Sequence, residues 1–257
     1  MKTKFKFVIP SYNNEEFVEY NLASILNQTY ENWEVRYIDD ASTDNTLDKV
    51  KSIVGSDPRF SLVKRQRNMG AAYNYFFELE DYLTNDEDII IHLDGDDWLY
   101  DEYVLEKLLK FYEEKDVWMT YGKFYCYDGT DQVIEANPQN TPYSDETHKN
   151  KSYRHDLWRA SHLRTYKTFL FNSLDKLELY SNIDGKLFWH ATDLAFQFAF
   201  LETCGKDKIG VVDFPTCIYN QSPKNSIRTA EREHIDNSIY EREIRNRPIN
   251  LKRKINK

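Results

Sequence analysis

Three carboxylates follow a short apolar run in the first half of the chain. The run spans residues 89–93 (Ile-Ile-Ile-His-Leu), and Asp94, Asp96 and Asp97 come directly after it. Because three anionic groups this close repel one another, the arrangement favours a bound cation. We expect a divalent metal ion that carries a phosphorylated substrate, since hard cations prefer oxygen ligands. The alternative interpretation is a solvated acidic turn after a strand.

An apolar run of this kind is typical of a strand buried on both faces of a parallel sheet. Similar strands are predicted at residues 5–9, 33–38 and 60–63, with amphipathic helices between them. This alternation predicts an α/β fold with right-handed crossovers. The loops after the strands should meet at one edge of the sheet. They carry Tyr12 and Asn13, Asp39 and Asp40, Arg65 and Arg67, and the three carboxylates.

Asn13 also has a local interpretation, because Glu16 follows it three residues later. This spacing predicts that Asn13 caps the first helix. Beyond residue 118 the pattern is weaker. It predicts an extended segment at 118–127, a loop at 131–151, helices at 161–171 and 190–201, and strands at 209–213 and 216–219.

We therefore expect two halves of one domain, residues 1–112 and 113–244, followed by a tail at 245–257. The tail has six basic residues and no acidic ones. A solvated terminus is the simpler interpretation, and a surface contact to a membrane or an acceptor is the alternative.

Composition narrows the class of protein. Aromatic residues make up 15% of the 257 residues, which predicts a packed core, and the net charge of −9 argues against a nucleic-acid partner. No window approaches the roughly 20 apolar residues that a membrane-spanning helix needs. The three cysteines have no metal-type spacing and favour a reducing compartment, so we expect a soluble cytoplasmic protein.

Five short motifs in order resemble the family-2-type glycosyltransferases with the GT-A fold. They lie at residues 8–13, 24–29, 39–44, 68–70 and 93–97. The resemblance implies a Rossmann-like, mostly parallel central sheet flanked by helices, with a smaller C-terminal acceptor-side region. It also implies inverting transfer of a sugar from a UDP-sugar donor to a hydroxyl acceptor, which could be a glycan or a hydroxylated protein side chain.

The resemblance assigns the donor site to the loops after the first two strands. Asp40 would accept a hydrogen bond from N3–H of uracil, which cytosine lacks. Tyr12 would stack on the base or the ribose, with Pro10 and Asn13 beside the nucleotide. Arg67 could pair with phosphate. The alternatives are a core aromatic for Tyr12 and a solvated side chain for Arg67.

The same likeness assigns the metal, Mn²⁺ or Mg²⁺, to the acidic loop. Asp96 and Asp97 would face the metal and the diphosphate, and Asp94 would reach the ribose or the sugar. Residue type does not separate these three roles, and Asp97 could instead cap the following helical turn.

For catalysis, the resemblance points to Asp193 as the general base that deprotonates the acceptor hydroxyl. Thr192 precedes it where the family usually has Glu, and a helix cap is the alternative for Asp193. Ser222 stands where many relatives have a metal-binding His, so Lys224 or Arg228 could clamp the diphosphate. The acceptor side would include His162, Arg164 and Trp189.

Two other classes of protein share this sheet edge. A sugar nucleotidyltransferase would carry a Gly-rich basic loop after the first strand, and residues 10–16 have neither glycine nor a basic residue. A non-catalytic nucleotide-sugar or glycan-binding module is the other alternative, and the retained carboxylates Asp40, Asp96, Asp97 and Asp193 argue against it.

Overall fold

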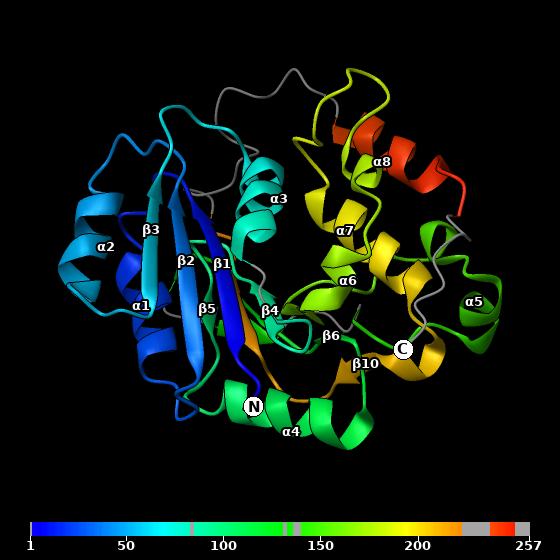
Figure 1. Cartoon of the computed structure of the whole chain (residues 1–257), viewed down its shortest axis with the longest axis horizontal. Coiled ribbons are helices and arrows are strands. Elements are labelled where there is room, and N and C mark those ends of the chain that lie inside the picture. The colour runs from blue at the N-terminus through cyan, green and yellow to red at the C-terminus, as the bar shows by residue number, and fades with distance from the viewer. Residues whose placement is uncertain (1, 83–84, 131–132, 136–139, 223–236, 250–257) are drawn as a thin grey trace.

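The computed structural model describes residues 2–82, 85–130, 133–135, 140–222 and 237–249 (Figure 1). In the first half, strands and helices alternate as the sequence predicts. The elements are β1 (Phe5–Ser11), α1 (Val18–Leu26), β2 (Trp33–Asp39), α2 (Thr46–Val54), β3 (Phe60–Lys64), α3 (Ala71–Tyr82), β4 (Ile89–His92), β5 (Trp98–Leu99) and α4 (Val104–Lys115).

The second half is more irregular. Its strands are β6 (Met119–Gly122), β7 (Tyr125–Tyr127), β8 (Val133–Glu135), β9 (Arg164–Lys167), β10 (Ile209–Val212) and β11 (Cys217–Asn220). Its helices are α5 (Asp145–Asn150), α6 (Thr168–Asn172), α7 (Thr192–Thr203) and α8 (Asn237–Asn246), with short 3₁₀ turns η1 (Tyr153–His155), η2 (Lys176–Leu179) and η3 (Lys206–Lys208).

The central sheet has the strand order β10-β6-β9-β4-β1-β2-β3. Strands β4, β1, β2 and β3 pair in parallel, as do β10 and β6. Only β9, among the strands of this sheet, runs antiparallel to its neighbours β4 and β6. The expectation of a mostly parallel sheet is therefore confirmed, and the carboxyl ends of β1 to β4 share one edge.

Two hydrophobic clusters cover the two faces of this sheet. Alternate residues of β1 separate them: Phe5 and Phe7 pack with α1, α2 and α4, whereas Val8 packs with α3, α6 and α7. Figure 1 shows α3 and α7 on the opposite side of the sheet from α1 and α2. Strand β4 is buried along its whole length, as its apolar run predicts.

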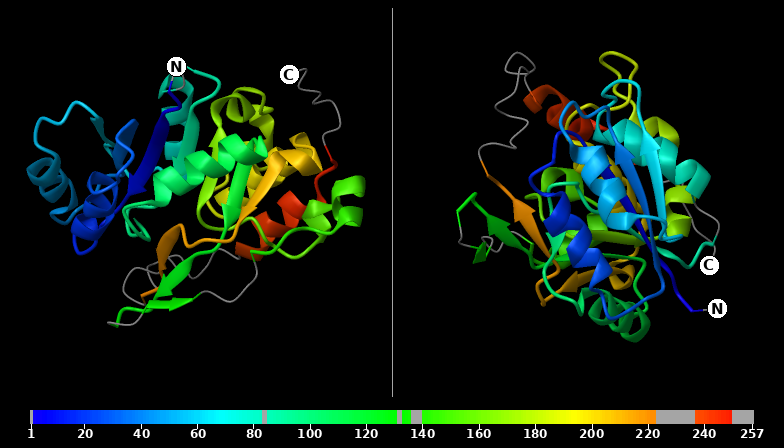
Figure 2. Two further views of the ribbon diagram at one scale, coloured as in Figure 1. Left: turned by 90° about the horizontal axis from the view of Figure 1, so that it is seen from below. Right: turned by 90° about the vertical axis from the view of Figure 1, so that its left-hand side faces the viewer.

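A second, four-stranded sheet has the order β5-β11-β7-β8. Figure 2 shows its strands projecting from the main body, below the central sheet in the left view. Strand β5 immediately follows the acidic loop, and β11 pairs antiparallel with it. The small sheet therefore brings residues near position 220 back to the acidic loop.

Two local predictions were wrong. Residues 161–171 are not one helix, because residues 164–167 form β9 between β4 and β6 before α6 begins. Asn13 does not cap α1, which begins at Val18. Asn13 has φ of 54°, and its Oδ1 accepts a hydrogen bond from the Thr43 backbone N–H at 2.8 Å, so it ties the loop after β1 to the loop after β2.

Across the described ranges, no helix is both long enough and apolar enough to cross a membrane.

Candidate active site

The acidic loop is held in a tight turn by its neighbours. The Asn21 side chain, fully buried on α1, donates to the backbone oxygens of Asp94 at 3.2 Å and Asp97 at 2.7 Å. Gly95 fits against β1, where a Cβ atom would lie 2.5 Å from the Ser11 side chain. Its N–H donates to the Pro10 backbone oxygen at 3.1 Å. The spacing of the three carboxylates is therefore fixed by the contacts of this loop with β1 and α1.

Asp94 is contacted from two sides. The Tyr75 hydroxyl, on α3, donates to Asp94 Oδ1 at 2.9 Å, and Arg164 Nη2 lies 3.4 Å from Asp94 Oδ2. Tyr75 in turn stacks on the buried His92 ring with 3.9 Å between centroids. In the pairing of β4 with β9, Arg164 lies opposite His92. Asp94 follows His92 by two residues, so the Arg164 side chain can reach it. The Asp94 side chain itself is 32% exposed and is open to a ligand.

Arg164 also contacts the predicted general base. Its Nη1 lies 3.8 Å from Asp193 Oδ2, and the Asp193 side chain is 31% exposed in the first turn of α7. Burial raises the pKa of Asp193, and the Arg164 charge acts in the opposite direction. The pKa of Arg164 is raised despite its burial, because Asp94 and Asp193 stabilise the cation. One guanidinium thus bridges the acidic loop and the candidate base.

Asp97 is the most enclosed of the three carboxylates, with 1% of its surface exposed. Its Oδ1 accepts from the Asn220 backbone N–H at 2.8 Å, and its Oδ2 lies 3.9 Å from His162 Nε2. Burial, with the charges of Asp96 and Asp94, raises the pKa of Asp97 well above its ordinary value. Desolvation and the Arg164 charge lower the pKa of His162. A neutral imidazole and crowded carboxylates are a suitable environment for a divalent cation.

The potential ligand atoms of Asp94, Asp97 and His162 lie within 4.8 Å of one another. Oxygen and imidazole donors of this kind fit Mn²⁺, and the carboxylates alone fit Mg²⁺. Asp96 is half-buried on the same turn. The structure therefore brings His162, expected on the acceptor side, to the acidic loop.

Asp40 lies in the loop after β2 and is 3% exposed. Its two carboxylate oxygens accept from the backbone N–H groups of Met69 and Gly70, each at 2.8 Å. A Cβ atom on Gly70 would lie 3.2 Å from the Trp189 ring, so Trp189 packs on this loop. Gly70 also has φ of 82°, which favours glycine.

A cavity of about 520 Å³ opens beside this loop and is lined by Arg65, Gln66, Arg67, Met69 and Tyr73. Arg67 is exposed there, which is compatible both with a phosphate-binding side chain and with a solvated one. The Arg65 guanidinium is less accessible to a phosphate group, because it pairs with Glu78 and donates to Asn74 Oδ1 at 2.9 Å.

Tyr12 extends from the end of β1 and is 44% exposed, so it is not a core aromatic. Pro10 lies in β1, and its backbone oxygen accepts the hydrogen bond from the Gly95 N–H.

Neither Asp97 nor Asp193 is a helix cap, so both of those alternative interpretations were wrong. Asp97 lies seven residues before α4, and its side chain accepts a hydrogen bond from the Asn220 backbone N–H. Asp193 lies inside α7, whose N-cap position is Ala191. Lys224 and Arg228 lie outside the described residues.

Three residues of this site were missed from the sequence. Asn21 and Tyr75 lie in helices at positions where hydrophobic periodicity does not distinguish a polar side chain with a role in the site from an ordinary buried one. Asn220 contributes its backbone N–H, which is independent of residue type. The only signal for Asn21 was its place on the apolar stripe of Val18, Leu22 and Ile25.

Comparison with known proteins agrees with this geometry. The family described as Glycosyl transferase family 2 matches residues 6–175. The putative teichuronic acid biosynthesis glycosyltransferase TuaG of Bacillus subtilis is 33% identical over 143 residues, 54% of each chain. UDP-Glc:alpha-D-GlcNAc-diphosphoundecaprenol beta-1,3-glucosyltransferase WfgD of Escherichia coli is 34% identical over 139 residues, 53% of this chain and 52% of that one. The chain spans about half the length of the curated relatives it matches.

Solved structures show the same fold. TarS residues 1–349 from S. aureus, in complex with UDP-GlcNAc, superposes with a TM-score of 0.61 and 19% sequence identity. The match covers 85% of this chain and 59% of that chain. At this identity the likeness concerns the fold, which is that of the GT-A glycosyltransferases.

Proposed function

Since the chain belongs to glycosyl transferase family 2, we propose that it moves a sugar from a UDP-sugar to a hydroxyl group of an acceptor. The observation that carries this proposal is the position of Arg164, between Asp94 in the acidic loop and Asp193 on α7. A donor group near Asp94 and an acceptor hydroxyl near Asp193 would meet beside one guanidinium. Proximity of this kind is what a single displacement between two bound substrates requires.

We assign the uracil ring to Asp40 and Tyr12, with Pro10 and Asn13 in the surrounding loops. Each carboxylate oxygen of Asp40 has a second lone pair beyond the one that Met69 or Gly70 uses, so it can still accept from N3–H. WfgD uses UDP-Glc according to its name, and TarS was solved with UDP-GlcNAc. These two relatives support a uridine nucleotide as the donor.

The diphosphate would lie between this loop and the acidic turn, with Arg67 on its outer side. Asp94, Asp97 and His162 would hold Mn²⁺ or Mg²⁺, with Asp96 a further candidate ligand. When bound, the ion would neutralise charge on the departing diphosphate. Asn21 and Asn220 would keep the ligands in place through the hydrogen bonds to this loop. Lys224 and Arg228 remain proposals for a diphosphate clamp from the C-terminal loop.

In the transfer step, Asp193 would take the proton of the acceptor hydroxyl while the acceptor oxygen attacks the anomeric carbon. The bond from that carbon to the UDP oxygen breaks on the opposite side, so the configuration inverts. A pKa raised by burial makes Asp193 a stronger base, and Arg164 keeps enough of it ionised to act. Arg164 is therefore a positioning residue for both carboxylates.

We further propose that residues 1–112 form the donor half and residues 113–244 the acceptor half of one domain. We place the protein in the cytoplasm, a location that is compatible with its free cysteines, of which Cys204 and Cys217 are buried.

A donor screen tests this function. The purified protein is incubated with Mn²⁺ and UDP-, GDP- or CDP-sugars, and released nucleoside diphosphate is measured. We expect release and binding with at least one UDP-sugar, and loss of uridine preference in Asp40→Asn. Turnover of a GDP-sugar without any UDP-sugar would contradict the Asp40 assignment. Binding of UDP-sugars without hydrolysis or transfer would support the non-catalytic module, and release of pyrophosphate from UTP and a sugar phosphate would support a nucleotidyltransferase.

A further inference from the structure

Trp189 lies four residues before Asp193, in the segment that leads into α7, and its half-buried side chain contacts the loop after β3. A Cβ atom on Gly70 would lie 3.2 Å from both Cε3 and Cζ3 of the Trp189 ring and 3.3 Å from Cδ2. These nearly equal distances mean that the face of the ring, and not its edge, packs on the Gly70 backbone. Carbon atoms in good contact are about 3.5–4.0 Å apart, so glycine is the residue that leaves room for the ring.

On one side of this contact, Gly70 belongs to the candidate donor site. Its N–H donates to Asp40 Oδ2 at 2.8 Å, and its backbone oxygen accepts from the Asn74 N–H at 3.2 Å in the first turn of α3. The next residue on α3, Tyr75, donates to Asp94 Oδ1. A shift of Gly70 would therefore be passed to both of the carboxylates that we assign to the donor.

On the other side of the contact, a short and constrained segment leads to Asp193. Ala191 has φ of 54°, and its backbone oxygen accepts from the Ala195 N–H at 3.1 Å in the first turn of α7. A residue other than glycine keeps this conformation only where its surroundings hold it. Ala191 is held in this way, because it packs against the core cluster that contains Phe196. Trp189 is therefore tied closely to the turn that carries Asp193.

The polar contacts of the site return to the same loop by a longer route. Arg164 lies between Asp193 and Asp94, at 3.8 Å and 3.4 Å. Asp94 accepts from Tyr75 on α3, the helix that begins directly after Gly70. The aromatic contact adds a direct link from this loop to α7, and it does so without a charged group.

We propose that Trp189 is a positioning residue for sugar transfer. Its ring holds the first turn of α7, and with it Asp193, against the loop that contains Gly70. The distance between the bound nucleotide and the base is then fixed by the fold. The inference rests on the proposed function, because it requires Asp193 as the base, and it assigns to Trp189 no contact with either substrate.

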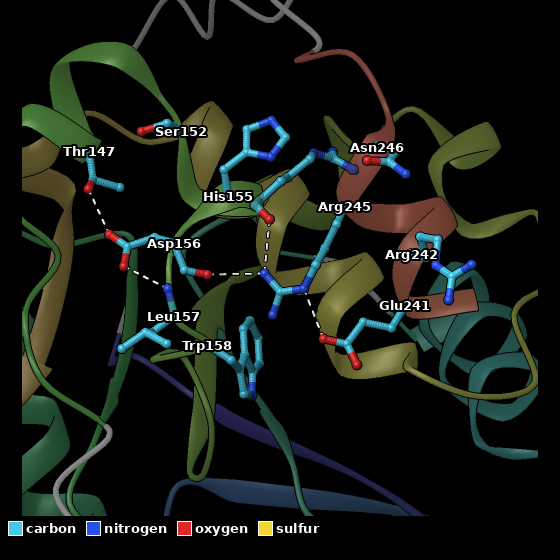
Figure 3. Close-up of a pocket in the computed structure, with 11 residues that line it drawn as sticks. Thr147, Ser152, His155, Asp156, Leu157, Trp158, Glu241, Arg242, Arg245 and Asn246 are labelled. Carbon is cyan, nitrogen blue, oxygen red and sulfur yellow. Dashed lines mark hydrogen bonds and ion pairs between the residues drawn. The ribbon is translucent and has the colours of Figure 1, made fainter. Parts of the chain in front are cut away.

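The first test compares kcat for sugar transfer and the Kd for UDP in Trp189→Ala and Trp189→Phe. A misplacement of about 1 Å can lower a rate about 100-fold, so we expect kcat in Trp189→Ala to fall about 10–100-fold, with a smaller change in the Kd. Trp189→Phe keeps a flat ring on Gly70 and should recover most of the rate. Trp158→Ala is the matched control, because Trp158 is also half-buried but lines a separate cavity beside α8 and η1 (Figure 3).

A second pair of variants tests the contact itself. Gly70→Ala places a Cβ atom against the ring and should lower kcat in the wild-type background. The same change should lower kcat less in Trp189→Ala, where the ring is absent. Non-additivity of this kind measures the interaction between the two residues. Effects that simply multiply would overturn the inference, because Trp189 would then act independently of Gly70.

Backbone amide exchange, measured on the same proteins without substrate, does not depend on activity. We expect faster exchange of residues 66–72 and 190–196 in Trp189→Ala and no change there in Trp158→Ala. If the wild type transfers no sugar, the proposed function fails, and the exchange still decides whether Trp189 holds these segments together. The inference is overturned if exchange is unchanged, if kcat of Trp189→Ala stays within about threefold of an active wild type, or if Trp158→Ala loses as much activity.

Discussion

Arg164 Nη1 lies 3.8 Å from Asp193 Oδ2, and Nη2 of the same guanidinium lies 3.4 Å from Asp94 Oδ2. The contact joins β9 to the start of α7 and to the acidic loop. Because Arg164 is almost fully buried, its charge is weakly screened, and it favours the ionised form of Asp193.

Replacing Arg164 by Gln should move the acid limb of the pH–rate profile to higher pH. The guanidinium favours the ionised form of Asp193, so its removal leaves burial to raise the pKa of Asp193 further. The base is then protonated at a pH where the wild type is still active. The measurement is kcat/KM against pH, with Arg164→Lys as the variant that keeps the charge. An unchanged acid limb in Arg164→Gln would show that Asp193 does not depend on Arg164.

Asp97→Asn should stabilise the metal-free protein and abolish metal binding. Because the pKa of Asp97 is raised in the folded state, its ionised form costs stability, and this cost grows as the pH rises above the unfolded pKa. At neutral pH we expect a gain of about 1 kcal/mol, or roughly 2–4 °C in Tm. Asn can still accept from Asn220. Asp48→Asn, at a side chain that is 82% exposed, is the control. A lower Tm together with retained Mn²⁺-induced stabilisation would count against this account.

Tyr75→Phe should weaken donor use without unfolding the chain. It removes the hydroxyl that donates to Asp94 Oδ1 and leaves the ring stacked on His92. A hydrogen bond to a charged group contributes about 1.5–3 kcal/mol, so we expect kcat/KM for the donor to fall about tenfold or more. Tyr103→Phe, at an exposed ring, should have no effect. Equal kinetics in both variants would mean that Asp94 is not held by Tyr75.

The sequence allowed prediction of the donor half more fully than of the acceptor half. Strands β1 to β4 were predictable because each is a short apolar run followed by a turn, and parallel pairing then places Tyr12, Asp40 and Asp94 at one edge. Strand β9 could not be predicted, because its four residues are too few to establish a hydrophobic period. Its place between β4 and β6 also depends on long-range pairing.

The contact between Arg164 and Asp193 could not be predicted for the same reason. It requires the β4–β9 register, which sets Arg164 opposite His92, and the position of α7. The position of His162 beside the acidic loop could not be predicted either. The family resemblance suggested a place near the acceptor, and the His162 side chain comes within 3.9 Å of Asp97 only once the strand after it is paired with β4.

Arg154→Met should destabilise the chain strongly. Arg154 and Glu202 are each about 2% exposed in their side chains, so the variant leaves a buried, uncompensated carboxylate. The expected loss is about 3–5 kcal/mol, measured by urea unfolding. The double variant Arg154→Met/Glu202→Met should recover much of it. A loss below about 1 kcal/mol in the single variant would mean that the pair does not hold η1 against α7.

The most direct test of the account is Asp193→Asn, with sugar transfer and UDP-sugar binding measured on the same protein. Asn keeps the shape of the side chain and removes the base. We predict that transfer falls by about 10²–10⁴-fold, while the Kd for the UDP-sugar changes by less than about threefold. Transfer at the wild-type rate, or an equal loss of binding and transfer, would contradict the assignment of Asp193 as the catalytic base.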